Sequence, residues 1–328
     1  MPLRRPLPEK VLVGYATHCS EKVLQSVRDG VNVVIWSFVE MVEQTEKKHD
    51  NSAQSQARCV SSFDIHCAQQ MIRQLDQEGY TDTIHLVSFG GWNGPHLPDA
   101  LTTNKMYQAW KEHIGGEDTL FHGVDWDLEG HDRLDHPNNE FSVKCLEAMG
   151  QFSELAKRDG FLVGMAPPQS YFDIETNHFS RFVNWKDHRQ WHDDFSYFGR
   201  NVYAYLLSKY GQSIDFVSVQ FYESYSRAGW EVFGQQMPPQ AYLRHYVQRL
   251  VEHHQESFFV NFEEDPSLDY NSRDVQFPLS KLVFGFANGW GFNDDDKVCY
   301  FDPNEIDIAY KALLKSNQTP RGFMFWVM

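Results

Sequence analysis

The 328-residue chain has few cysteines and no clustered metal-ligand motif. Its 5 cysteines (Cys19, Cys59, Cys67, Cys145 and Cys299) are too few and too scattered for a disulfide framework. A single bridge between Cys59 and Cys67, across a loop, remains open. No CxxC pair indicates zinc, the histidines show no ligand spacing, and Asp294-Asp295-Asp296 reads as a solvated loop rather than a calcium site. Neither a metal nor a cofactor is expected.

The chain also lacks clustered positive charge and long apolar runs. Its formal net charge is −16 and it has no run rich in Lys or Arg, which argues against nucleic acid and anionic membranes as partners. No stretch is long enough to span a bilayer. The start, MPLRRPLPEK, lacks the apolar segment of a signal peptide, so we expect either an intracellular protein or one whose leader has been removed.

What the chain does have is a regular alternation of β-branched segments and helical patterns. The strand-like segments cover residues 11–17, 31–40, 83–91, 121–130, 161–168, 214–223, 281–289 and 322–328. Apolar residues at helical spacing predict helices that end near Gly30, Gly79 and Gly160, and two more that begin at Pro239 and Pro303.

Alternation of this kind is typical of a parallel sheet, and no linker rich in Pro, Gly or Ser divides the chain. The sequence therefore predicts an α/β fold in which residues 1–328 form a single catalytic domain, a closed (β/α)8 TIM barrel. The connections over 41–66, 172–212 and 252–280 are longer than usual, and long connections in compact domains tend to carry function.

One predicted strand, over 121–130, carries a row of acidic side chains. Because strand side chains alternate, Asp125, Asp127 and Glu129 share one face, and the apolar residues between them must meet the surrounding helices. The carboxylates are therefore expected inside the barrel, about 6–7 Å apart, where repulsion should keep at least one protonated near neutral pH. Folding does not require such a row, although a polar strand end or a metal site remains an alternative.

This segment resembles DGxDxDxE, the fourth-strand motif of family 18 glycoside hydrolases, the chitinases and their relatives, with His122 in place of the first Asp. Four other segments are similar to motifs of this family, in the expected strand order: Ser88-Phe89-Gly90-Gly91-Trp92 to SxGG on strand three, Met165-Ala166-Pro167 to the end of strand five, Gln220-Phe221-Tyr222 to strand six, and Gly322-Phe323-Met324-Phe325-Trp326 to strand eight. Glu223 stands where the family commonly has Asn or Asp.

The resemblance implies a retaining chitinase in which the substrate's own N-acetyl oxygen is the nucleophile. Glu129 would be the general acid and base, and Asp127 would orient the acetamide. Asp125 would share a proton with Asp127, and Tyr222 would hydrogen-bond the acetamide oxygen. The implied substrate-binding residues are Gln220, Met165, Gly90, Gly91, Trp92 and Trp326, the last as the floor under the cleaved sugar. Chitin or N-acetylglucosamine oligosaccharides are the implied ligands. The resemblance also implies secretion, although this chain shows no signal peptide, and we expect a monomer.

Residues 290–321 alone separate the last two predicted strands, too few for the α+β domain that many processive relatives insert there. We therefore expect a shallow groove, as in the plant-type class III branch, and endo cleavage. Two alternatives stay open. An endo-β-N-acetylglucosaminidase acting on N-glycans uses the same acidic motif, whereas a chitin-binding lectin on this barrel typically loses the acid that Glu129 supplies.

Overall fold

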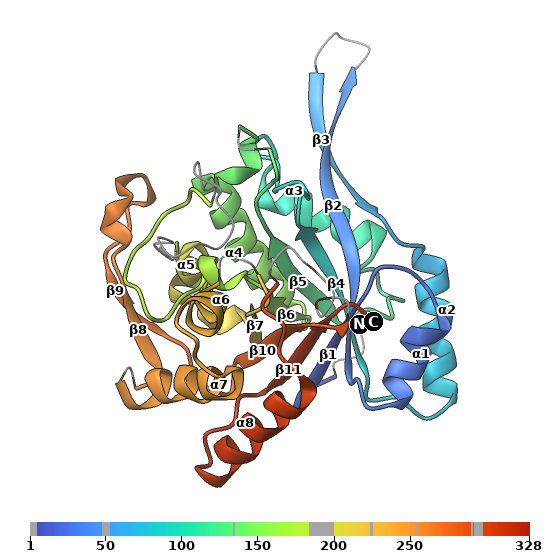
Figure 1. Ribbon diagram of the computed structural model, residues 1–328. Coiled ribbons are helices and arrows are strands. Elements are labelled where there is room, and N and C mark those ends of the chain that lie inside the picture. Colours follow the sequence, from blue (N-terminus) through green and yellow to red (C-terminus); the bar gives the residue numbers. More distant parts are fainter. Residues whose placement is uncertain are drawn as a thin grey trace.

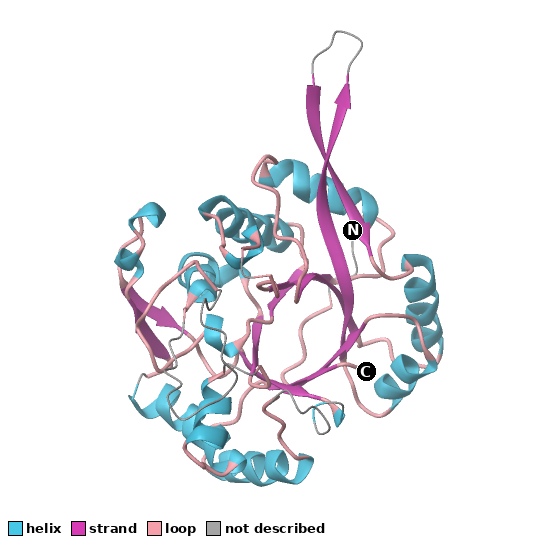
Figure 2. Ribbon diagram, turned by 45° about the horizontal axis from the view of Figure 1, so that its top comes forward, coloured by secondary structure: helices cyan, strands magenta, loops and turns pink. Residues whose placement is uncertain are grey.

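A computed structural model describes residues 5–47, 53–133, 135–183, 200–223, 226–253, 255–289, 291 and 298–328; the triple aspartate at 294–296 lies outside these ranges. Within them, eight parallel strands form a closed ring, seen along its axis in Figure 2, and β1 pairs with both β11 and β2 to close it. The ring consists of β1 (Val11–Ala16), β2 (Val33–Lys47), β4 (Ile84–Gly91), β5 (Gly123–Leu128), β6 (Leu162–Met165), β7 (Phe216–Gln220), β10 (Leu282–Ala287) and β11 (Gly322–Trp326). The predicted barrel is confirmed.

Helices surround the ring (Figure 1): α1 (Glu21–Arg28), α2 (Ile65–Gln77), α3 (Thr103–His113), α4 (Val143–Arg158), α5 (Val202–Tyr210), α6 (Arg227–Gly229), α7 (Pro239–Gln248) and α8 (Pro303–Lys315). The predicted helices are present, with Pro239 and Pro303 in the first turns of α7 and α8. Between β10 and β11 the described residues form α8 and a short 3-10 turn at Gly289 and Gly291, and none of them is in a strand, as expected for a barrel without an inserted domain there.

The second barrel strand does not end where the sequence indicated. β2 continues to Lys47 and pairs antiparallel with β3 (Ala53–Ser61), from Val39 opposite Ser61 to Lys47 opposite Ala53. Figure 1 shows this ribbon as an arm that extends away from the barrel. The sequence indicated a connection over 41–66 and missed this ribbon because side chains such as Glu43, Gln44 and Arg58 are exposed, so the segment lacks the apolar period of two.

A second hairpin lies in the long connection over 252–280. It pairs β8 (Ser257–Val260) with β9 (Arg273–Gln276), outside the barrel sheet. This connection, like the one over 172–212 that contains α5, therefore carries secondary structure of its own.

The strands divide the core into an inner and an outer cluster. Val13, Tyr15 and Ile35 belong to the inner cluster, enclosed by the ring. Trp126 belongs to the outer cluster, and its indole N–H donates to Ser153 Oγ on α4 at 2.9 Å. The apolar face of the acidic strand therefore meets the helices, as predicted, and the opposite face points into the barrel.

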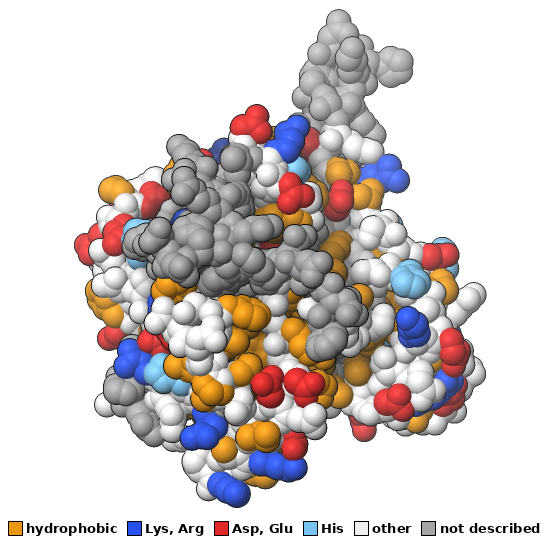
Figure 3. Space-filling model, in the orientation of Figure 1, with side chains coloured by type: hydrophobic (Ala, Val, Ile, Leu, Met, Phe, Trp, Pro, Cys, Tyr) orange, Lys and Arg blue, Asp and Glu red, His pale blue; other side chains and the backbone are white. Residues whose placement is uncertain are grey.

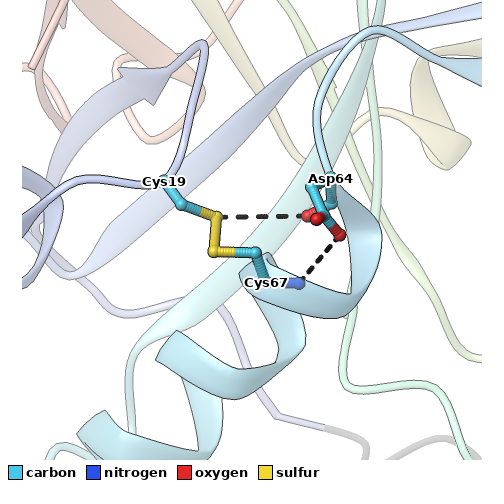
Figure 4. The surroundings of a disulfide bond; sticks show 3 residues. All are labelled: Cys19, Asp64 and Cys67. Atoms are coloured by element: carbon cyan, nitrogen blue, oxygen red, sulfur yellow. Dashed lines mark hydrogen bonds between the residues drawn. A yellow bond between two sulfur atoms is a disulfide. The ribbon is translucent and has the colours of Figure 1, made fainter.

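One disulfide links the loop after β1 to the first turn of α2 (Figure 4). It joins Cys19 and Cys67, whose Cα atoms are 6.3 Å apart, next to Asp64, which accepts the Cys67 backbone N–H at the start of the helix. The bridge considered from the sequence, Cys59 to Cys67, is wrong: Cys59 is a free thiol on β3 and points into the outer core.

Charged side chains of both signs are exposed on the surface (Figure 3). On the face in Figure 3, Lys and Arg side chains are scattered among acidic ones. Among the described residues, no helix has both the length and the apolar character needed to cross a bilayer.

Candidate active site

The acidic row of β5 ends at the carboxyl end of the barrel strands. In the β4–β5 register Ser88 lies opposite Asp125 and Gly90 opposite Asp127, so the row lies beside the glycine segment of β4. Asp125 is fully buried, Asp127 is 3% exposed, and Glu129, just beyond the end of β5, is partly buried. Since active sites of such barrels lie at this end of the ring, Glu129 is the carboxylate nearest the mouth.

Asp125 is held at the base of the row. Its Oδ2 accepts hydrogen bonds from the Tyr15 hydroxyl and the Ser88 hydroxyl, both at 2.7 Å, whereas its buried Oδ1 has no partner among the described residues. A side chain at Gly164 would place its Cβ 2.7 Å from that Oδ1, so only glycine leaves this oxygen free. Burial raises the pKa of Asp125 to about 6, against the two hydrogen bonds that stabilise its charge.

Asp127 and Glu129 form a coupled pair bridged by Gln220 of β7. The Gln220 amide donates to Asp127 Oδ1 at 2.8 Å and to the Ala166 carbonyl at 2.6 Å, and it lies 3.4 Å from Glu129 Oε1. Burial, and then the charges of Glu129 and Asp125, raise the pKa of Asp127 well above its usual value. A hydrogen bond to Glu129 raises the pKa of Asp127 further, so Asp127 also holds a proton at neutral pH and donates it toward Glu129.

Glu129 keeps its proton near neutral pH. Burial raises its pKa to about 8, and the charge of Glu223 acts in the same direction, whereas the hydrogen bonds from Gln220 and Asp127 oppose the shift. A carboxyl group with this pKa is protonated at pH 7 and can donate that proton, which is the property required of a general acid.

Tyr222 and Glu223 follow β7 at the same end of the barrel. Burial and the charges of Asp127 and Glu129 raise the pKa of Tyr222, so its hydroxyl stays protonated. Glu223 accepts hydrogen bonds from the Ser170 backbone N–H at 3.0 Å and from the Ser170 hydroxyl at 2.5 Å. Burial raises the pKa of Glu223 to about 7. Since its charge also raises the pKa of Glu129, Glu223 is a fourth carboxyl group of the site.

Aromatic side chains lie around the carboxylates. Trp326, at the end of β11, stacks on Phe38 with ring centroids 5.7 Å apart and meets the edge of Tyr15 at 5.2 Å. Trp92, directly after β4, is 50% exposed. Two non-proline peptide bonds of the described chain are cis, Ser37–Phe38 and Trp326–Val327. Trp326 of β11 and Phe38 of β2, the two strands that flank β1, thus pack together near the mouth.

Gly90 and Gly91 bring β4 close to the acidic strand. Gly90 has a φ of +108°, and a Cβ there would come within 2.4 Å of the Asp127 carbonyl oxygen. A Cβ on Gly91 would come within 2.4 Å of the Phe38 ring. Glycine is therefore required at both positions for the strands and the Phe38 ring to approach this closely.

Met165 does not lie with the other predicted site residues. It pairs with Trp126 in the β5–β6 register and is fully buried in the outer cluster between barrel and helices. The residue before it, Gly164, is the one that faces Asp125. The expectation that Met165 contacts substrate is therefore corrected, because alternation along β6 turns its side chain toward the helices.

Sequence reasoning missed three residues that build the site: Tyr15, Ser88 as a partner of Asp125, and Phe38. A signal for Tyr15 was present, since it shares a face with Val11 and Val13 and is the polar end of an otherwise apolar row. Phe38 gave none, because an irregularity in the β2–β4 pairing between Ser37 and Val39 changes the alternation there.

His122, which replaces the first Asp of the motif, lies at the other end of β5. Its Nδ1 accepts the His85 backbone N–H at 2.9 Å, and burial lowers its pKa to about 4. It is therefore a neutral, buried residue that does not touch the acidic row. In the described ranges no three His, Cys, Asp or Glu side chains are grouped to hold a metal ion.

Fold and site together define a (β/α)8 barrel with a row of buried carboxyl groups rising to its mouth. Among solved structures, a chitinase from Chromobacterium violaceum is similar, with a TM-score of 0.52 and 11% identity over 97% of this chain and 94% of its own. A class V chitinase from Pseudomonas fluorescens has a TM-score of 0.52 and 12% identity over 97% and 95% of the two chains. No protein-family model and no curated protein sequence matches. At these identities the likeness shows the fold, so the predicted chitinase-like barrel is confirmed.

Proposed function

We propose that the protein is a glycoside hydrolase that cleaves β-1,4 linkages in N-acetylglucosamine polymers such as chitin, with Glu129 as general acid and base. The observation that carries the proposal is the protonated carboxyl group of Glu129 at the outer end of a buried acidic row, with a pKa of about 8. A general acid must hold a proton at working pH and must lie where a leaving oxygen can reach it. Glu129 meets both conditions.

The other carboxyl groups then serve the substrate-assisted route, in which the acetamide oxygen attacks the sugar carbon. Asp127 orients the acetamide nitrogen, and its hydrogen bonds to Gln220 and Glu129 support this by holding it in place. When the Asp127 side chain turns away from Glu129, its proton would be shared with Asp125, whose Oδ1 has no other hydrogen-bond partner among the described residues. The Tyr222 hydroxyl, which stays protonated beside the charges of Asp127 and Glu129, would donate a hydrogen bond to the acetamide oxygen.

Trp326 is the proposed floor under the cleaved sugar, and Trp92 a neighbouring contact. The packing of Trp326 on Phe38 and Tyr15 supports this role, because a ring fixed from below offers a flat apolar face without loss of side-chain freedom. We further propose a shallow groove and endo cleavage, supported by the short connection between β10 and β11.

Two other functions compete with this proposal. An endo-β-N-acetylglucosaminidase would use the same acidic row on the chitobiose core of N-glycans. A chitin-binding lectin would need no acid, and the presence of Glu129 with a raised pKa favours an enzyme over it. We prefer chitin as the proposed substrate because the two similar solved structures are of chitinases.

The test compares the parent with Glu129→Gln on chitin tetramer and on a high-mannose glycoprotein. The amide keeps the shape of the side chain but has no acidic proton, so tetramer cleavage should fall at least 10²–10⁴-fold, the usual contribution of proton transfer. Binding of the tetramer should stay within a few-fold, because Trp326 and Tyr222 are unchanged.

Glu154→Gln, an exposed residue of α4, is the matched control and should cleave like the parent. Parent-like turnover in Glu129→Gln would mean that the acid is misassigned. Release of glycan from the glycoprotein without tetramer cleavage would favour the endo-β-N-acetylglucosaminidase. Fresh tetramer products should be β-anomers by NMR, because two displacements at one carbon retain configuration; α-anomers would exclude the mechanism.

A further inference from the structure

Two loops at the barrel mouth, one after β4 and one after β5, are interlocked through Asn93. The Asn93 backbone N–H donates to the Gly130 carbonyl at 3.1 Å, and its side-chain amide donates to Asp132 Oδ2 at 2.6 Å. In return, the Asp132 backbone N–H donates to Asn93 Oδ1 at 2.8 Å. Asn93 has a φ of +66°, a left-handed conformation that Asn tolerates better than most residues. Asp132 is therefore held in one orientation.

The other oxygen of Asp132 holds a tryptophan. The Trp92 indole N–H donates to Asp132 Oδ1 at 2.9 Å, while half of the Trp92 surface stays exposed. The edge of the indole is thus tied to the β5 loop, and much of the ring is left uncovered.

The backbone of Trp92 lies level with that of the proposed acid. Gly91 lies opposite Leu128 in the β4–β5 register, and the Asn93 backbone N–H donates to the Gly130 carbonyl. Trp92, between Gly91 and Asn93, is therefore level with Glu129 of the segment that follows β5. A second residue of the same loop, His96, donates from Nε2 to the Glu129 carbonyl at 2.8 Å. The loop that carries Trp92 is therefore anchored on both sides of Glu129.

We propose that Asp132 is a positioning residue that fixes the Trp92 indole as a stacking platform for a sugar next to the cleaved bond. This inference rests on the proposed function. A pyranose presents an apolar C–H face that packs on an aromatic ring, and a ring already fixed loses little side-chain freedom on binding. The specific role of Asp132 is to remove that loss, which corresponds to a factor of about two to ten in affinity for one side chain.

The experiment measures calorimetric binding of chitin tetramer to variants in the Glu129→Gln background, where the ligand is not consumed. Asp132→Ala should raise Kd about two- to tenfold. Asp132→Asn should recover part of the affinity, because its amide oxygen can accept the indole N–H while its NH2 group loses the hydrogen bond from the Asn93 amide. Asp135→Ala, an exposed acidic residue of the same loop, is the matched control and should bind like the parent.

A double-mutant cycle separates positioning from loop damage. In a Trp92→Phe background no indole N–H exists, so Asp132→Ala should then change Kd by less than twofold. With Glu129 intact, the loss should appear in KM rather than in kcat. An equal loss with and without the indole, or no loss at all, would overturn the positioning role while leaving the proposed function standing. Failure of the parent to bind or cleave the tetramer would overturn both.

Discussion

The proposed chemistry of this barrel rests on single carboxyl groups, and their protonation is set by burial. Asp125, Asp127, Glu129 and Glu223 all have raised pKa values, and burial is the largest cause for each. Burying four ionised carboxyl groups would cost free energy on folding. The folded protein therefore keeps protons on these groups that the unfolded chain would release at the same pH. The raised pKa that suits Glu129 to its proposed role as an acid therefore also lowers the stability of the fold at alkaline pH.

The pH dependence of stability tests this link at the residue level. Glu129 has an ordinary pKa when unfolded and one of about 8 when folded, so the folded state binds more protons between these values and loses stability as the pH rises through that range. Glu129→Gln removes this loss. Its melting temperature should exceed that of the parent more at pH 9 than at pH 5, by an amount equivalent to at most a few kcal/mol.

Scanning calorimetry at the two pH values measures the difference, with Glu154→Gln as the control that should follow the parent at both. A constant offset between Glu129→Gln and the parent from pH 5 to pH 9 would mean that the pKa of Glu129 is not raised by folding.

Among the elements, helices and the extended ribbon differ in how far local chemistry defines them. α8 begins with a capping box: Asp302 accepts the Asn304 backbone N–H at 2.8 Å, and Glu305 accepts the Asp302 backbone N–H at 3.0 Å. The β2–β3 arm has no comparable local signal and depends on cross-strand pairing. Helix ends could therefore be predicted closely, and the arm could not.

Removing the cap of α8 is a test at this level. Asp302→Ala leaves backbone N–H groups of the first turn without an acceptor and should lower the free energy of unfolding by about 1 kcal/mol, within a usual range of about 0.5–2 kcal/mol. Asp302→Ser should recover most of it. Asp307→Ala on the same helix breaks only an exposed pair with Lys311 and should cost about 0.5 kcal/mol or less in urea unfolding. Equal costs for the two Ala variants would contradict the capping argument.

For the molecule as a whole, the Cys19–Cys67 disulfide joins two segments on either side of the β1–β2 seam, where the ring closes. The bridged residues are 48 positions apart, so the bond restricts a sizeable loop of the unfolded chain. Its contribution is to stability, since neither cysteine contacts the carboxyl groups of the site.

Replacing both cysteines, in Cys19→Ser/Cys67→Ser, should lower the free energy of unfolding by about 2–4 kcal/mol. Tetramer cleavage at 25 °C should match the parent. Reduction of the parent with dithiothreitol should give the same shift in a urea titration and should not affect the double variant. A shift below about 0.5 kcal/mol in both experiments would mean that the bond adds nothing to stability in solution.

The barrel and the inward direction of Asp125, Asp127 and Glu129 could be derived from the sequence alone, because alternation along a strand is a local property that burial of one face makes visible. The partners of these residues could not. Tyr15, Ser88 and Gln220 reach the acidic row through the register of strands far apart in the chain, and Cys19 meets Cys67 only once the ring has closed. Such contacts depend on how each strand is shifted and twisted against its neighbours, which no single segment of sequence specifies.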